Sequence, residues 1–168
     1  GQPPVLSNTA PIASHPPPVD VRPPLVVDLD GTLTPSDTLL ESIVLLLKRS
    51  LHNAFRLPFW LAKGRAFFKA QIARHIEFPG ELLPLRQPLL DYLRAQKAEG
   101  RKLVLATAAH KSIAEAVAKR VGLFDEVIAT DERNLKGKEK LRVIRERVGD
   151  DFVYVGDSIS DLEVWKAS

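Results

Sequence analysis

The sequence contains no cysteine and no methionine, and only four of its 168 residues are histidine. Without cysteine the chain cannot hold a disulfide, a thiol nucleophile or a zinc–thiolate site, and four histidines argue against a histidine-rich metal site. No run of 18 apolar residues occurs, so nothing in the sequence predicts a membrane span. The net charge of +3 is too small to predict nucleic acid as a partner, and we expect none. Because position 1 is not methionine, we expect a fragment or a processed piece of a longer protein.

Proline is concentrated at the start of the chain. Eight of the 13 prolines fall within the first 24 residues, together with Ser, Asn and Thr and without apolar periodicity. This composition predicts a disordered, proline-rich tail over residues 1–23. The segment lacks the basic start and continuous apolar stretch of a signal peptide.

Short apolar runs alternate with helical patterns in most of the remaining sequence. The runs at 25–27, 102–106, 126–129 and 152–155 are typical of buried parallel strands. Apolar residues at helical spacing lie at 89–93, 113–121 and 141–148, between successive strands. This order predicts an α/β fold with a Rossmann-like parallel sheet and helices on both faces, built from residues 24–36 and 88–168.

Residues 35–87 break this alternation. They show helical patterns throughout, with expected interruptions at Pro58 and Gly64. An all-helical insertion after the first strand predicts a cap, over residues 37–87, that covers the carboxyl edge of the sheet. Ligands bind at that edge in open α/β sheets.

The first candidate site follows the first strand, where residues 28–34 read Asp-Leu-Asp-Gly-Thr-Leu-Thr. Asp28 and Asp30 can face one cleft if the chain turns at Gly31, which tolerates tight backbone geometry. One carboxylate can attack phosphorus as a nucleophile, and a second can protonate the leaving group and later deprotonate water. Asp-Gly alone is common in simple turns, so the whole motif carries the interpretation.

The fourth strand ends in a second acidic motif, Gly-Asp-Ser-Ile-Ser-Asp at residues 156–161. Asp157 facing Asp28 makes an oxygen-rich site of the kind that Mg²⁺ prefers. The alternative is a plain helix cap from Asp157 or Ser158.

Two further segments can supply phosphate contacts. Thr107 and Ala108 follow the second strand at an expected helix start, where backbone N–H groups attract anions, although this pattern taken alone is more often a plain helix cap. A phosphoryl site also needs a fixed cation. We favour Lys140, four residues before apolar Ile144, and keep Lys136, one turn earlier in the loop, as the alternative.

In this order, the four motifs resemble those of the haloacid dehalogenase (HAD) superfamily of phosphatases. The resemblance implies a Rossmann-like core with a helical cap, phosphorylation of Asp28, and Asp30 as the acid/base. It implies Mg²⁺ on Asp28, the Asp30 carbonyl and Asp157, with Asp161 supporting that metal shell. Thr107 and the lysine would hold the phosphoryl group. A Gly three positions before Lys140 is similar to the phosphoserine-phosphatase-like subgroup.

A second resemblance rests on residues 57–66, 134–137 and 161–165. These segments are similar to HAD domains that precede a UbiA-family membrane prenyltransferase domain. The chain ends after the fourth motif, so the fifth strand of the family is missing here. The resemblance implies a C-terminal prenyltransferase domain in the full-length protein and tethering at the cytoplasmic side of the inner membrane.

The predicted cap is strongly basic. Between residues 43 and 78, seven Lys and Arg side chains accompany a single Glu, and aromatic residues are interleaved with them. This pattern indicates a solvated basic face, contact with an anionic membrane surface, or recruitment of a phosphorylated substrate.

We therefore expect a Mg²⁺-dependent phosphatase that acts on a phosphorylated small molecule or a lipid-linked phosphate. Two alternatives stay open from the sequence. One is a phosphomutase, because the residues do not separate water from a sugar hydroxyl as acceptor. The other is a non-catalytic module that regulates or anchors a UbiA-type prenyltransferase.

Overall fold

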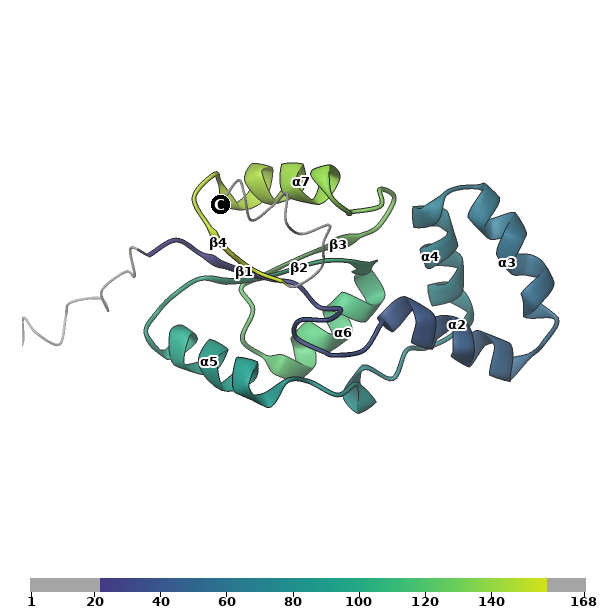
Figure 1. Ribbon diagram of the computed structural model, residues 1–168, viewed down its shortest axis with the longest axis horizontal. Helices are drawn as coiled ribbons and strands as arrows, with labels where there is room; N and C mark the ends of the chain where they lie inside the picture. The colour runs from purple at the N-terminus through teal and green to yellow at the C-terminus, as the bar shows by residue number, and fades with distance from the viewer. Residues whose placement is uncertain (1–21, 157–168) are drawn as a thin grey trace, which may run out of the picture.

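Four strands form a parallel sheet in the order β3-β2-β1-β4 (Figure 1). The computed structural model describes residues 22–156. The two central strands are buried on both faces, which explains why their sequences are continuous apolar runs rather than alternating patterns. The α/β fold with a parallel sheet predicted from the sequence is confirmed. The strands are β1 Leu25–Val27, β2 Leu103–His110, β3 Glu126–Thr130 and β4 Val153–Val155.

Helices cover both faces of the sheet (Figure 1). Leu103 and Leu105 of β2 pack into the core beneath α5 (Gln87–Ala98) and α6 (Lys111–Val121). Val104 and Ala106 point to the opposite face and pack against α7 (Lys138–Val148). Successive strand residues alternate between faces, so one apolar run supplies both cores.

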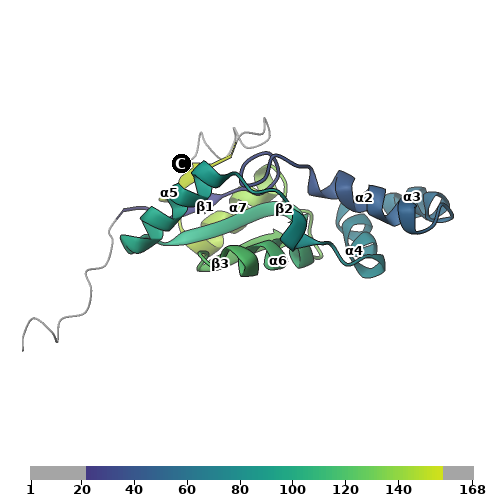
Figure 2. The same ribbon diagram turned by 90° about the horizontal axis from the view of Figure 1, so that it is seen from below.

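The cap consists of α2 (Thr38–Arg49), α3 (Asn53–Ala62) and α4 (Arg65–His75), which project from one end of the core (Figure 2). Leu46, Phe68 and Ile72 form its small buried core. The expectation of helix throughout residues 35–87 is wrong at both ends of the segment. At its start, residues 35–37 precede α2 and are not helical. Residues 76–86 contain only the single 3₁₀ turn η1 (Gly80–Leu82), and this return segment is held by Arg120, which donates to the carbonyls of Gly80 and Leu83.

Pro58 does not interrupt the helix in which it lies. Pro58 lies inside α3, and the helical segment is interrupted only at Gly64, between α3 and α4. Gly64 has a φ of 111°, a value that glycine adopts readily and other residues rarely do. Pro58 and Ala54 are both exposed. The Ala54 carbonyl that loses its helical partner can therefore be hydrated, which reduces the cost of proline at this position.

The first described residues contact the core. Arg22 pairs with Glu99 at 3.1 Å, and the Pro24 carbonyl accepts a hydrogen bond from the Val153 N–H. The predicted tail otherwise falls on residues 1–21, outside the described residues. Within residues 22–156, no helix is long and apolar enough to cross a membrane.

Candidate functional site

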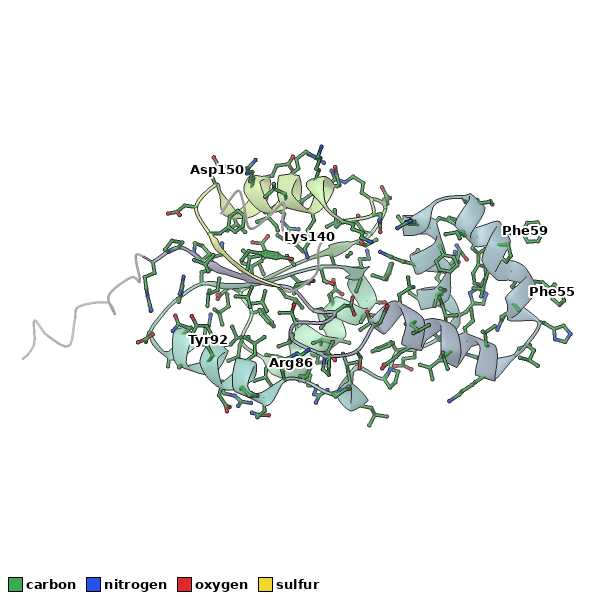
Figure 3. The ribbon with its side chains drawn as sticks, viewed as in Figure 1. Phe55, Phe59, Arg86, Tyr92, Lys140 and Asp150 are labelled. Atoms are coloured by element: carbon green, nitrogen blue, oxygen red, sulfur yellow. The ribbon has the colours of Figure 1, made fainter. Side chains whose placement is uncertain are left out.

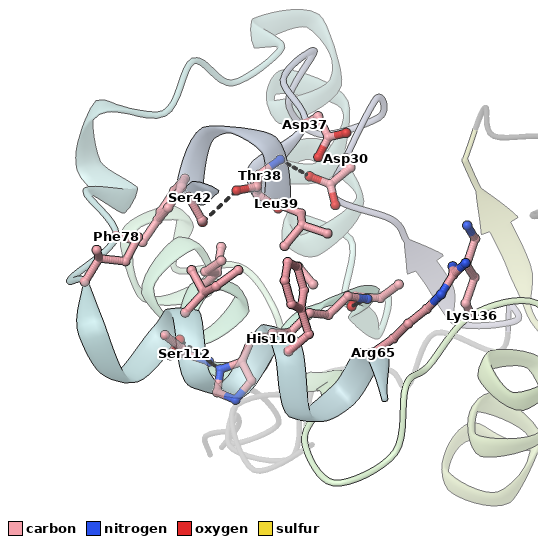
Figure 4. A pocket seen from close by; sticks show the side chains of 18 of the residues that line it. Asp30, Asp37, Thr38, Leu39, Ser42, Arg65, Phe78, His110, Ser112 and Lys136 are labelled. Atoms are coloured by element: carbon pink, nitrogen blue, oxygen red, sulfur yellow. Dashed lines mark hydrogen bonds between the residues drawn. The ribbon is translucent and has the colours of Figure 1, made fainter. Parts of the chain in front are cut away.

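A cavity of about 540 Å³ lies between the carboxyl ends of β1 and β2 and the cap (Figure 4). Asp28 and Asp30 line it from the first strand end. Both core and cap contribute walls, so substrate in this cavity would touch both. The cap and the segment after it contribute to the cavity wall the residues Thr38, Leu39, Arg65, Phe68, Lys69, Ile72, Ile76 and Phe78.

The turn after β1 places both carboxylates at the cavity. Asp28 is buried, its N–H donates to the Val155 carbonyl at 3.0 Å, and its Oδ1 accepts from the Leu29 N–H at 2.8 Å. The chain then turns back, with the N–H groups of Thr32 and Thr34 both donating to the Leu29 carbonyl. Gly31 has a φ of 73°, which makes this reversal possible without side-chain strain.

Lys140 lies against Asp28. Its Nζ is 3.1 Å from Asp28 Oδ1, and only 3% of its side chain is exposed. The same ammonium hydrogen-bonds the Tyr154 hydroxyl and lies 5.0 Å from the centre of that ring. Lys136 also lines the cavity but is exposed. Of the two lysines left open by the sequence, Lys140 is therefore the one that contacts the strand-end carboxylate.

Asp30 is held by the start of the cap. Its Oδ1 accepts a hydrogen bond from the Thr38 N–H at 2.8 Å (Figure 4). Burial raises the pKa of the Asp30 carboxyl above its ordinary value, although the Thr38 hydrogen bond and nearby Lys69 oppose the change. A carboxyl with a raised pKa holds its proton more readily, as a general acid must.

The second strand does not end where the sequence indicates. β2 continues through His110 after a register shift, and α6 begins only at Lys111, so the helix start expected at Thr107 and Ala108 is wrong. Thr107 is fully buried, and its Oγ1 accepts from the Ala109 N–H at 3.0 Å. Ala108 is among the described residues that line the cavity, whereas Thr107 is not.

Lys69 is a site residue that the sequence reasoning missed. It extends from α4 to the core, where its Nζ donates to the Ala108 carbonyl at 2.7 Å and to Asn134 Oδ1 at 2.6 Å. Burial lowers its pKa to about 8, while the negative charge of Asp30 opposes this change. One sequence feature could have indicated that Lys69 faces the core. It follows Phe68 and precedes Ile72 by three residues, and both of these apolar residues are buried.

The two ends of the cavity differ in character. Arg65 and Lys136 lie at one end, and Phe78 lies at the other (Figure 4). His110 also faces this space, and burial lowers the pKa of its imidazole. The apolar part of the wall comes from Leu39, Phe68, Ile72, Ile76, Phe78 and Ile113.

The carboxylates present are of the type that Mg²⁺ prefers. Asp28 and Asp30 offer hard oxygen ligands at one cavity wall. Val155 of β4 pairs with Val27 of β1, so these two strands are neighbours in the sheet. In the sequence, the acidic motif at residues 156–161 begins directly after β4. Asp157 and Asp161 lie outside the described residues. Within residues 22–156, no group of three His, Asp or Glu side chains could hold a metal ion.

Comparison with known proteins gives the family. The chain is 36% identical over 151 residues to the protein y4nM of Sinorhizobium fredii, covering 89% of this chain and 29% of that protein. Its fold is similar to that of the HAD family hydrolase t0658 of Salmonella enterica serovar Typhi, with a TM-score of 0.62 and 17% identity over 91% of this chain and 62% of that one. It is also similar to a phosphoserine phosphatase solved as a phospho-aspartyl intermediate analogue, with a TM-score of 0.55 and 16% identity over 88% and 84% of the two chains. The family model for haloacid dehalogenase-like hydrolases matches residues 25–166, and the chain belongs to that family.

Proposed function

We propose that this chain is a Mg²⁺-dependent phosphatase that hydrolyses a phosphate monoester through an aspartyl-phosphate intermediate on Asp28. The observation that carries the proposal is the buried pair of Asp28 and Lys140 beside Asp30 at the mouth of one cavity. A nucleophile, an acid and a fixed cation are the groups that phosphoryl transfer needs. Membership of the HAD-like hydrolase family supports the same reaction class.

In the first step, a carboxylate oxygen of Asp28 attacks phosphorus and the bond to the leaving oxygen breaks. Asp30 gives its proton to that oxygen, so the product leaves as an alcohol. In the second step, Asp30 takes a proton from water as the water attacks phosphorus, and the acyl-phosphate bond breaks. The raised pKa of Asp30 supports its role as the acid in the first step.

Positive charge must accompany the phosphoryl oxygens. Lys140 is already fixed against Asp28, and Lys136 lies at the cavity wall. Asp28, the Asp30 carbonyl and Asp157 would hold Mg²⁺, with Asp161 in support, and the metal would offset the charge of the phosphoryl group. Ala108 offers backbone contacts near the end of β2. Thr107 would act indirectly, because its Oγ1 accepts a hydrogen bond from the Ala109 N–H and so orders the backbone next to Ala108.

The cavity also indicates the kind of substrate. Beyond the charged end, its wall is largely apolar, with Leu39, Ile76 and Phe78 partly exposed within it. Such a wall fits an apolar group attached to phosphate, in a small molecule or a lipid-linked phosphate. It fits a phosphomutase less well, because a sugar phosphate needs polar partners around its hydroxyl groups.

The decisive experiment is hydrolysis of an aryl phosphate, with and without Mg²⁺, by the native chain and by Asp28→Asn. We expect Mg²⁺-dependent turnover that Asp28→Asn abolishes, because an amide cannot form the acyl phosphate. Asp91→Asn, an exposed position on α5, is the matched control and should retain full activity. Phosphoserine is the polar comparison substrate, and we expect slower turnover of it.

Two results would reject this proposal. Turnover that survives Asp28→Asn would exclude Asp28 as the nucleophile. Absence of turnover with every monoester, despite a folded chain, would favour the non-catalytic regulatory or anchoring module.

The chain spans 29% of the length of y4nM, so that relative contains much additional sequence. This coverage supports a second part of the proposal, that the domain belongs to a longer protein. The proposed UbiA-type prenyltransferase domain at the inner membrane rests on the resemblance of residues 57–66, 134–137 and 161–165 alone. The complete reading frame tests it. Several apolar runs of membrane-spanning length after residue 168 are expected.

A further inference from the structure

The outward side of α3 carries large apolar side chains that nothing in the described chain covers. Leu51, in the turn before the helix, is 77% exposed, Phe55 is 77% exposed and Phe59 is 73% exposed. Their spacing of four residues places them on one stripe. Phe55 and Phe59 point away from the cap at the end of the molecule farthest from the core sheet (Figure 3).

The opposite side of α3 already makes the contacts that hold the helix in the cap. Asn53 is buried and donates its side-chain N–H to the Leu46 carbonyl at 3.0 Å. Leu57 and Trp60 pack against the cap core, and Trp60 also lies 4.9 Å from the His75 ring. The exposed stripe therefore adds nothing to the packing of the cap. A contiguous exposed apolar surface of this kind marks an interaction site.

The aromatic residues of the cap are interleaved with basic residues in the sequence, but they differ in exposure in the structure. Phe68 is buried and lines the catalytic cavity, and Trp60 is half-buried. Leu51, Phe55 and Phe59 are the most exposed of the large apolar side chains described in the cap, ahead of Leu40 at 58% and Leu61 at 51%. We call this stripe the α3 face. Arg56, which hydrogen-bonds His75, and Lys63, which lies over the Phe67 ring, are exposed cations between this stripe and α4.

The charge around the α3 face selects its partner. Residues 42–76 contain seven Lys and Arg side chains and no Asp or Glu. Arg56 follows Phe55 directly, Lys63 follows Phe59 by four residues, and both are exposed. Glu41 and Glu77 lie directly outside this segment. An apolar stripe in a strongly basic segment complements a surface that is apolar inside and negative outside. An anionic lipid bilayer has this character, whereas an apolar protein surface gains nothing from the cations.

We propose that the α3 face lies on an anionic membrane surface. Phe55, Phe59 and Leu51 enter the boundary between headgroups and acyl chains, and Arg56 and Lys63 bind the lipid phosphates at its edge. None of these five residues lines the catalytic cavity. The inference therefore stands independently of the proposed phosphatase activity.

Vesicle co-sedimentation with the 168-residue chain tests the proposal. We expect binding to phosphatidylcholine mixed with phosphatidylglycerol, weak binding to phosphatidylcholine alone, and a decrease in binding as salt is raised. The double variant Phe55→Ser/Phe59→Ser should lose at least about tenfold in partition constant, because it removes two large apolar side chains that would be buried in the bilayer. Arg56→Glu/Lys63→Glu should lose a larger factor, since it removes two positive charges and adds two negative charges at an anionic surface.

Two control variants make the same kinds of change at exposed positions outside the cap. Leu82→Ser alters an equally exposed leucine on η1, and Lys119→Glu reverses an exposed charge on α6. Both should bind vesicles like the native chain. All variants should keep the native circular dichroism spectrum, and turnover of a soluble aryl phosphate should be unchanged.

Three outcomes would overturn the proposal. The first is equal binding to neutral and anionic vesicles, and the second is equal binding by the native chain and the Phe55/Phe59 variant. The third is a concentration-dependent dimer, without vesicle binding, that Phe55→Ser/Phe59→Ser abolishes. That result would assign the α3 face to a second copy of the chain.

Discussion

At the scale of single residues, the buried pair of Asp28 and Lys140 has two consequences. Both charges are removed from water, and each compensates the other at 3.1 Å. Removing one partner leaves an uncompensated buried charge, which is far more costly than losing an exposed pair. Lys140 therefore stabilises the core and also takes part in the proposed chemistry.

Lys140→Ala should lose at least about 100-fold in turnover, because one transition-state cation is removed. It should also lower the free energy of unfolding by about 3–5 kcal/mol, because the buried Asp28 carboxylate loses its ion pair with Lys140. Lys136→Ala should lose about tenfold or less, and exposed Lys138→Ala should stay within about 0.5 kcal/mol of the native stability. Steady-state kinetics and urea denaturation measure both effects. A larger activity loss in Lys136→Ala than in Lys140→Ala would contradict this assignment.

Asp30→Asn should increase stability at neutral pH in a Mg²⁺-free buffer. Burial raises the pKa of Asp30 from 3.8, so the folded chain binds more protons than the unfolded chain between 3.8 and the raised value. The stability that this group contributes is complete below 3.8 and is lost as pH rises through the folded pKa. Asparagine removes the buried charge and can still accept the Thr38 hydrogen bond.

Thermal denaturation over a pH series checks this expectation. The gain from Asp30→Asn should be largest at neutral pH and should shrink as the buffer becomes acidic. Asp150→Asn changes an exposed carboxylate and should show no such trend. A gain that is equal at every pH would contradict the electrostatic explanation.

At the scale of elements, the start of α7 decides where Lys140 lies. Gly137, directly before the helix, has φ 58° and ψ −124°, a combination that residues with a Cβ avoid. Lys136 in the loop and Lys140 in the helix both line the cavity on either side of this glycine. The loop conformation thus sets the direction in which the helix enters the site.

Gly137→Ala should destabilise the chain by about 1–3 kcal/mol through backbone strain. It should also reduce turnover at least about tenfold, because Lys140 needs to be placed to within a fraction of an ångström. Gly122→Ala is the control: its left-handed cap ends α6, and an added Cβ meets nothing within 4 Å. That variant should lose about 1 kcal/mol of stability and keep its activity.

At the scale of the whole molecule, activity depends on how the cap meets the core. Lys69 is the cap side chain that bridges them, through the Ala108 carbonyl and Asn134. Its hydrogen bonds close the cavity between β2 and α4. The contact is stronger in the ammonium form, and burial lowers the pKa of Lys69 to about 8.

We therefore expect kcat/KM to fall as pH rises through about 8, since the neutral amine binds the core less strongly. Lys69→Arg keeps its charge to higher pH and should move this fall upward, while Lys69→Met should be impaired at every pH. A pH series of kcat/KM for the three proteins is the measurement. An unchanged alkaline limb in Lys69→Arg would show that another group titrates there.

Local patterns were sufficient for the sheet and for the strand-end acids. Buried parallel strands are apolar on both faces, so β1 to β4 could be located as short β-branched runs. Asp28 and Asp30 could be assigned to a cavity because every parallel strand ends at the same edge. Lys140 could be favoured over Lys136 because its distance from buried Ile144 defines a helix face.

Other features depended on contacts between segments far apart in the chain. The true end of β2 at His110 depends on its pairing with Thr130, and the burial of Lys140 depends on Tyr154 of β4. Lys69 looked like any other basic residue of the cap until α4 was packed against β2. Periodicity reports which side of an element is apolar, but it carries no information about which partner that side meets. Spatial packing therefore separated the lysines at the cavity, Lys140 and Lys69, from the solvated ones.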